Sequence, residues 1–275
     1  MKRSADLERR LRSLETLGEA VGAMKSLSAH HFRESRGAVA PARAYREGVE
    51  RILASTGASI PKGAGPCGML VVGAELGLCG GYNSRVVAVA VEHRHALGPG
   101  PTLCVGHRAS MLLARQGIDV PRTFAAPTST RGIPALLLHL AEEALDTYVG
   151  HELSRLDVVS SRFGGIGVEK AVTAQLLPFP EAARGAPSFG QVPRVRYVGP
   201  EHLASVAARE FLYIALYDVL LDALASEHGA RLVATQSAES WLDERTDGLR
   251  RHLAAARREG STQEMIEIVA GARAR

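Results

Sequence analysis

The chain has no proline after Pro200, although 13 prolines occur in its 275 residues. Proline interrupts helices because it lacks a backbone N–H and clashes with the preceding turn. Its absence leaves residues 201–275 free to form one helix, which would extend about 110 Å at 1.5 Å per residue. This length exceeds the width of a compact domain. We therefore predict a projecting helical rod whose apolar stripe needs cover from outside this chain.

Cysteine is also scarce: the chain has three, Cys67, Cys79 and Cys104. Their number is odd, and they lack the spacing of a metal site. This pattern argues against a disulfide framework and favours a reducing compartment, the cytoplasm. The charged start at residues 1–6 is unlike a secretory signal. The cysteines do not indicate a metal site, and we expect neither a metal nor a cofactor.

Long hydrophobic runs and a charge excess of one sign are missing as well. The longest apolar stretch, residues 211–225, contains Asp218 and Asp222 and falls short of the roughly 20 residues that a membrane span needs. The 33 basic residues are interspersed with 29 acidic ones, so the net charge does not indicate nucleic-acid binding. We expect neither membrane insertion nor a nucleic-acid partner.

Both ends of the chain show the periodicity of long helices. Apolar residues recur every three or four positions from Leu7 to Leu53, and again from Leu203 to Ala256. Pro41 predicts a kink or an interruption in the first helix, and glycines such as Gly229 predict weak points in the second. Two long ends that flank one compact domain can meet only as an antiparallel pair, which predicts a coiled coil.

The middle of the chain changes to a pattern of short apolar runs alternating with helical segments. Strands are expected at 69–72, 102–105, 155–163 and 170–177, and helices at 83–97, 107–116 and 133–149. This alternation predicts an α/β fold, a Rossmann-like sheet with helices on its faces. The expected organisation is a helix at 1–57, an α/β domain at 67–200 that ends in a proline-rich loop, and a helix at 201–275.

Several motifs, in order along the chain, resemble one family. They are Ala23-Met24-Lys25 in the first helix, Gly77-Leu78-Cys79-Gly80-Gly81-Tyr82-Asn83 after the first strand, Val105-Gly106-His107-Arg108 after the second, Leu156-Asp157-Val158-Val159 and Leu176-Leu177-Pro178 late in the domain, Ser226-Glu227-His228-Gly229-Ala230-Arg231, and Thr262-Gln263-Glu264 near the end. Together they resemble the gamma subunit of F-type ATP synthases over nearly the whole chain.

The resemblance implies a mechanical function without bond chemistry. In such complexes the paired helices form the central rotary shaft inside a ring of three alpha and three beta subunits. The α/β domain contacts the membrane rotor, the c-ring, and the epsilon subunit is a further partner. Rotation couples proton or sodium flow to ATP synthesis or hydrolysis at the cytoplasmic face of the inner membrane.

The family motifs also imply where the partner contacts lie. The residues expected to contact the alpha/beta ring are Met24, Lys25, Glu75, Cys79, Asn83, Arg257, Arg258, Thr262, Gln263 and Glu264. Alternatives remain for some: Met24 also suits a coiled-coil core, the two arginines also suit a solvated face, and Cys79 suits a buried thiol. The glycines before Asn83 match no phosphate-binding motif and predict tight turns instead.

The chain departs from the family pattern at several motif positions. Glu75-Leu76 stand where the family has Asp followed by Arg or Gln, and Val21-Gly22 replace the Thr and the basic residue that usually precede Ala-Met. Ala254 and Ser261 fall on the usual Asn and Ile positions of the tail. Tyr197-Val198-Gly199-Pro200 replaces a Tyr-Glu-Pro motif, and Tyr197 is the expected contact to the rotor. These departures support the hypothesis of a divergent, alternative type of F-ATPase.

Two rival classes remain open from the sequence alone. A Rossmann-like nucleotide-binding enzyme with helical arms, or a stand-alone coiled-coil scaffold, would have the same element order. Two histidine clusters invite a metal interpretation: Glu92-His93-Arg94-His95, predicted as a solvated polar turn, and His30-His31, for which a polar surface is the simpler prediction.

Overall fold

The computed structural model describes residues 2–56, 62–179 and 199–273. The chain divides into two compact units. The coiled-coil unit combines Met1–Leu27 with Ala234–Arg275, and the α/β unit comprises Ser28–Val233. Two helices contribute to both units: α1, Lys2–Thr56, and α5, Pro200–Arg273.

In the coiled-coil unit, α1 and α5 pair in antiparallel fashion. Ion pairs join residue 8 to 257, 15 to 250 and 25 to 239, so the two residue numbers always total 264 or 265. From α1, Val21 is buried and Leu14 is half-buried, whereas Leu17 is exposed. From α5, Leu242 and Leu253 are buried. The expected apolar stripe therefore forms the seam, but Leu17 and Leu27 are exposed and lie outside it.

The α/β unit is built on a five-stranded sheet in the order β3-β2-β1-β4-β5. The first four strands in this order pair in parallel, and β5 pairs antiparallel to β4. The strands are β1 (Gly65–Val72), β2 (Thr102–Val105), β3 (Arg122–Phe124), β4 (Leu153–Phe163) and β5 (Glu169–Leu177). The helices between them are α2 (Tyr82–Leu97), α3 (His107–Arg115), the 3-10 turn η1 (Thr130–Gly132) and α4 (Ile133–Gly150).

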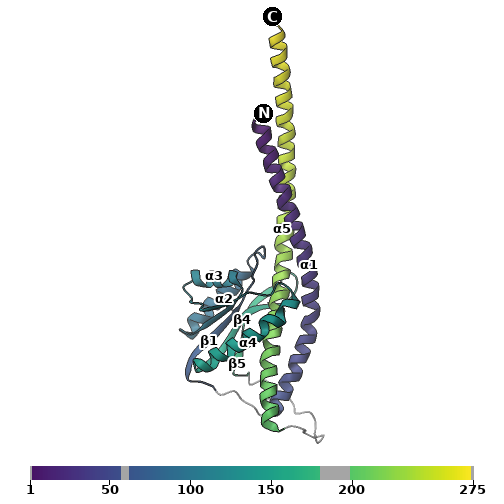
Figure 1. Cartoon of the computed structure of the whole chain (residues 1–275). Helices are drawn as coiled ribbons and strands as arrows, with labels where there is room; N and C mark the ends of the chain where they lie inside the picture. Colours follow the sequence, from purple (N-terminus) through teal and green to yellow (C-terminus); the bar gives the residue numbers. More distant parts are fainter. Residues whose placement is uncertain (1, 57–61, 180–198, 274–275) are drawn as a thin grey trace. The chain divides into compact units, whose positions relative to one another are not determined.

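Helices cover both faces of the sheet, and alternate strand residues point to opposite faces. On one face, Leu70 and Leu103 pack with α4 and with the parts of α1 and α5 that belong to this unit. On the other, Met69 and Cys104 pack with α2 and α3. Figure 1 shows these elements around the sheet. A parallel sheet buried on both faces explains why its central strands appear in the sequence as continuous apolar runs.

Ion pairs tie α1 to α5 beside this core. Arg43 donates two hydrogen bonds to Asp222, at 2.8 and 2.7 Å. Arg46 donates to Asp218 at 2.7 Å. Both carboxylates are buried. Burial raises the pKa of Asp218 above its ordinary value, and the two arginines oppose that shift.

The predicted fold class is confirmed, with three corrections to its elements. The interruption expected at Pro41 does not occur, since α1 continues through it; Val39 and Ala42 beside it are buried and hold this turn in the core. The glycines of α5 do not interrupt it either. Strand β3 was not predicted. Most of the expected loop, 180–198, lies outside the described residues.

Candidate partner-contact surfaces

The turn between β1 and α2 has a backbone conformation that favours glycine. Gly80 has a φ of 55° and Leu78 a φ of 58°, both in the left-handed region. The closest packing is at Gly73, just before the turn, where a Cβ would lie 2.4 Å from the Cβ of Ala109. The turn thus needs glycine for its geometry at Gly80 and for its packing at Gly73.

Glu75 joins three chain segments at the carboxyl ends of the parallel strands. Its carboxylate accepts hydrogen bonds from the backbone N–H groups of His107 (3.2 Å) and Ala126 (3.0 Å). The His107 ring nitrogen Nδ1 lies 2.6 Å from the other oxygen. Desolvation opposes ionisation, but these hydrogen bonds outweigh it and hold the pKa of Glu75 below its ordinary value. Glu75 is therefore an ionised bridge.

Asn83 and Cys79 are buried and face the interior of the turn. The Asn83 side-chain oxygen accepts from the backbone N–H of Ala74 at 2.8 Å, and its amide lies 3.8 Å from the Cys79 sulfur. Burial raises the pKa of the Cys79 thiol, which disfavours the nucleophilic thiolate. The structure therefore supports the interpretation of Cys79 as a small buried side chain.

An arginine of α5 also holds the turn between β1 and α2 in place. Arg231 is 1% exposed; it donates to the carbonyls of Gly77 (3.1 Å) and Leu76 (3.4 Å) and pairs with buried Glu227. Tyr82 adds a hydrogen bond to the carbonyl of Ala223 at 3.2 Å. The motif 226–231 and the glycine turn, far apart in the sequence, thus form one structural site.

His228 belongs to the same anchor. Its Nε2 lies 3.2 Å from the carbonyl of Thr128, and its Nδ1 lies 3.2 Å from the Arg231 guanidinium. Burial, followed by the charge of Arg231, lowers the pKa of His228 to about 4. The ring is neutral at physiological pH and completes the connection between α5 and the loop before η1.

The structure gives inward roles to the three turn residues expected to contact the ring, Glu75, Cys79 and Asn83. Their part in partner contact stays a prediction. The side chains that this turn exposes are Leu76, 43% accessible, and Leu78, 51% accessible. Sequence analysis missed both as contact candidates, although an apolar residue in a turn signals either burial or a partner.

In the coiled-coil unit, the expected contact residues lie on or beside the seam. Met24 is half-buried, which suits its alternative role in the coiled-coil core. Lys25 donates to Glu239 at 2.5 Å. Arg257 donates to Glu8 at 2.7 Å, and Arg258 to the carbonyl of Ala254 at 3.3 Å. Lys25 and Arg257 thus join the two helices, whereas Arg258 bonds within α5; the contact of all three to partners stays a prediction.

The end of α5 extends past the start of α1. Paired residue numbers total 264 or 265, so the described part of α1, from Lys2 onward, pairs with α5 up to about residue 263. Thr262, Gln263 and Glu264 are exposed there. Apolar side chains that are at least half exposed follow them: Met265, Ile266, Ile268 and Val269.

Trp241 is a further residue that the sequence analysis did not select. It is the single tryptophan of the chain, and on α5 of the coiled-coil unit it is 58% exposed. A large exposed aromatic side chain is typical of a protein–protein contact. Tyr197, the expected rotor contact, lies outside the described residues.

The segment Glu92–His95 differs from its prediction as a solvated turn. His93 Nε2 lies 2.8 Å from the carboxylate of Asp157, which is 1% exposed. Arg94 is buried and donates to the carbonyls of Cys67 (2.9 Å) and Pro101 (3.0 Å). The prediction was wrong for His93 and Arg94, because a buried carboxylate and backbone carbonyls of distant segments supply their partners. Glu92 and His95 are exposed, as predicted.

These features define a class of protein: an α/β domain whose chain ends form a coiled coil with an apolar tip left for a partner. Curated relatives match the chain over nearly its full length. The ATP synthase gamma chain of Moorella thermoacetica is 27% identical over 286 residues, covering 99% of both chains. That of Pelotomaculum thermopropionicum is 29% identical over 282 residues, covering 98% of both.

Solved structures share the fold. A chain of the Euglena gracilis mitochondrial ATP synthase, OSCP/F1/c-ring, aligns over 99% of this chain and 94% of its own length, with a TM-score of 0.66 and 15% identity. A chain of the Tetrahymena thermophila mitochondrial ATP synthase central stalk and c-ring covers 80% of this chain with a TM-score of 0.60 and 19% identity. The family model described as ATP synthase matches residues 3–274. The chain belongs to the gamma family of ATP synthase, a non-catalytic subunit.

Proposed function

We propose that this chain is the central rotary shaft of an F-type ATP synthase or ATPase. The observation that carries the proposal is the apolar tip of α5: Met265, Ile266, Ile268 and Val269 are 50–71% exposed on a helix that has run past its partner. Leaving these side chains in water is unfavourable by the hydrophobic effect. A sleeve formed by other subunits would remove them from water.

The proposed partners are a ring of three alpha and three beta subunits around the helices, with the epsilon subunit and the c-ring at the α/β unit. The names of the relatives and of the structural neighbours support this assembly. The complex would couple proton or sodium flow to ATP turnover. The chain would lie at the cytoplasmic face of the membrane as a peripheral subunit. Within the described residues, no helix has the length and apolarity to cross a bilayer.

A shaft transmits conformation only if its faces make different contacts with different ring subunits. We propose that Met24, Lys25, Arg257, Arg258, Thr262, Gln263 and Glu264, together with the turn of Glu75, Cys79 and Asn83, contribute these contacts, and that Tyr197 contacts the rotor. The departures of this chain from the family motifs at Glu75-Leu76 and Ser261 favour a divergent partner set.

The proposal is tested by co-expressing the chain with alpha and beta ATPase subunits and purifying through beta. One copy per three-plus-three ring and a higher rate of ATP hydrolysis are the expected results. A chain that lacks residues 262–275 should assemble or couple poorly while its α/β unit stays folded. The control is Ala254→Ser, an exposed change on the same helix. Purification of the full chain alone, with nucleotide bound, would contradict the proposal and favour an enzyme.

A further inference from the structure

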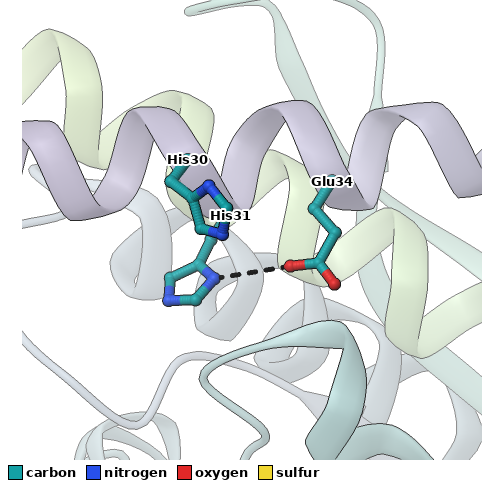
Figure 2. Close-up of side chains that lie close together, drawn as sticks. All are labelled: His30, His31 and Glu34. Atoms are coloured by element: carbon teal, nitrogen blue, oxygen red, sulfur yellow. Dashed lines mark ion pairs between the residues drawn. The ribbon is translucent and has the colours of Figure 1, made fainter.

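Three side chains with metal-ligating atoms lie together on one turn of α1, within the α/β unit. His30, His31 and Glu34 each offer one nitrogen or oxygen atom, and these atoms lie within 4.8 Å of one another. Figure 2 shows the three side chains on the same side of the helix, with the His31 ring facing the Glu34 carboxylate. We propose that they bind a divalent transition-metal ion, with Zn²⁺ as the probe.

The distance between His31 and Glu34 suits a shared ion better than a direct bond. His31 Nδ1 and Glu34 Oε2 are 3.7 Å apart, too far for a hydrogen bond. Two ligand atoms that each lie about 2.0–2.2 Å from a tetrahedral zinc ion are roughly 3.3–3.5 Å apart. Moreover, Nδ1 of His31 is buried without a hydrogen-bond partner. A metal ion would satisfy this nitrogen.

The carboxylate is held in place for this role. The hydroxyl of Thr130 donates a hydrogen bond to Glu34 Oε1, which leaves Oε2 facing His31. Hydrogen bonds from outer groups of this kind orient ligands at metal sites.

His228 lies beside the cluster and supports it. The ring of His228 packs against that of His31 at 5.2 Å between centroids, but both of its nitrogens already face protein atoms, Thr128 O and Arg231. His228 therefore supports the ligand ring rather than binding the ion. His30 is exposed, so its side chain can rotate onto the ion, and water can take a remaining position. Two imidazoles and one carboxylate are typical ligands of zinc.

The chain contains a matched control pair. His139 Nδ1 and Glu142 Oε2 lie 3.9 Å apart on α4 with the same spacing of three residues. Their side chains are 73% and 62% exposed, and the described residues bring no third ligand to them in a cluster. A zinc affinity that depends on His31 but not on His139 would show that the cluster, rather than any His–Glu pair, binds the ion.

The test uses the full chain, prepared without a histidine tag and with its thiols reduced. Zn²⁺ affinity is measured near neutral pH by competition with a chromogenic chelator, and Co²⁺ replaces zinc for a visible spectrum of the ligand field. We expect one ion per chain. The Zn²⁺ affinity should fall by at least about ten-fold in His31→Ala, His30→Ala and Glu34→Gln, and by about ten-fold in Thr130→Val. His139→Ala should bind as the parent chain does.

Two outcomes would overturn the proposal. The first is that the parent chain does not bind Zn²⁺. The second is that the His30→Ala/His31→Ala double variant keeps the same affinity and Co²⁺ spectrum, which would place the ion at other groups such as the cysteines. Circular dichroism confirms folding, and His30, being exposed, provides a variant that removes a ligand without disturbing the core. The measurement needs no ring subunit, so its failure leaves the shaft proposal unaffected.

Discussion

The two units of the chain differ in how much of their stability lies within them. In the α/β unit, a doubly covered sheet buries two large clusters of side chains, many of them completely. In the coiled-coil unit, the buried apolar residues are Val21, Leu242 and Leu253 among those described, with Thr235 and Thr246 beside them. A two-helix seam of this kind gains little from burial. We therefore expect the α/β unit to be stable by itself and the coiled-coil unit to gain stability from a partner.

The ion pairs of the two units also differ in burial. In the α/β unit, Arg231 and Glu227 are almost inaccessible and pair with each other, and Arg231 also donates to the carbonyls of Gly77 and Leu76. In the coiled-coil unit, pairs such as Arg250 and Glu15 lie at the surface, with 56% and 42% of the side chains exposed. Buried pairs are costly to break, and exposed ones contribute little. Substitutions in the two units should therefore have effects of different size.

The largest effect is expected from Arg231→Met, which leaves Glu227 buried without its partner and removes the donor to Gly77 and Leu76. We expect the free energy of unfolding of the α/β unit to fall by about 3–5 kcal/mol. Urea unfolding followed by far-UV circular dichroism measures this loss. Adding Glu227→Gln should restore part of the stability. A loss below about 1 kcal/mol would contradict the importance of this anchor.

A pair of leucine truncations compares the cores directly. Leu140→Ala, at a position on α4 with no exposed surface, should cost about 2–5 kcal/mol through lost burial and a cavity. Leu253→Ala, in the open seam of the coiled coil, should cost about 1–2 kcal/mol because neighbouring side chains and water fill the space. Fluorescence of Trp241 reports on the coiled-coil unit alone. Equal costs would remove the distinction between the units.

Glu75→Gln probes the turn and its pH dependence. The pKa of Glu75 is lowered in the folded chain, so the unfolded chain binds more protons at acidic pH and stability increases with pH there. At neutral pH, the free energy of unfolding of the wild type should exceed that of the variant by about 1–3 kcal/mol. This advantage should disappear as the pH falls below the ordinary value of 4.5. Glu142→Gln, at an exposed position, is the control, and a constant difference at all pH values would contradict the prediction.

The smallest effect is expected from Lys25→Met, which removes the bond to Glu239 in the coiled-coil unit. The partly exposed pair should contribute less than about 1 kcal/mol, and the contribution should decrease with added salt. Thermal unfolding monitored by Trp241 fluorescence measures it. Assembly with the ring should respond more strongly than stability does. An unchanged ATPase rate in the assembled complex would argue against a contact role for Lys25.

Much of the fold could be predicted because its long elements have strong periodicity. Helices α1 and α5 were expected from their apolar stripes, and β2, Thr102–Val105, was predicted at its observed bounds. In contrast, β3 has only three residues, Arg122–Phe124, and follows Pro121 without an apolar run. It becomes a strand by pairing with β2, which the local sequence does not encode.

The polar parts of the candidate site were harder to predict. A glutamate in a turn, such as Glu75, usually indicates a solvated surface, yet here the start of α3 and the loop after β3 bring backbone N–H groups to it. Likewise, only the folded chain shows that Arg231 reaches the turn of Gly77, 154 positions away. The motifs identified the right segments, but the partners depend on long-range packing.

The constant pairing register in the coiled-coil unit has a consequence for how such a chain can change its length. Because residue 8 faces 257 and residue 25 faces 239, an insertion in one helix displaces every later pair unless the other helix gains the same number of residues. Whole heptads keep the seam in phase. Evolution or engineering can therefore lengthen this pair only by matched additions of about seven residues in two distant parts of the gene.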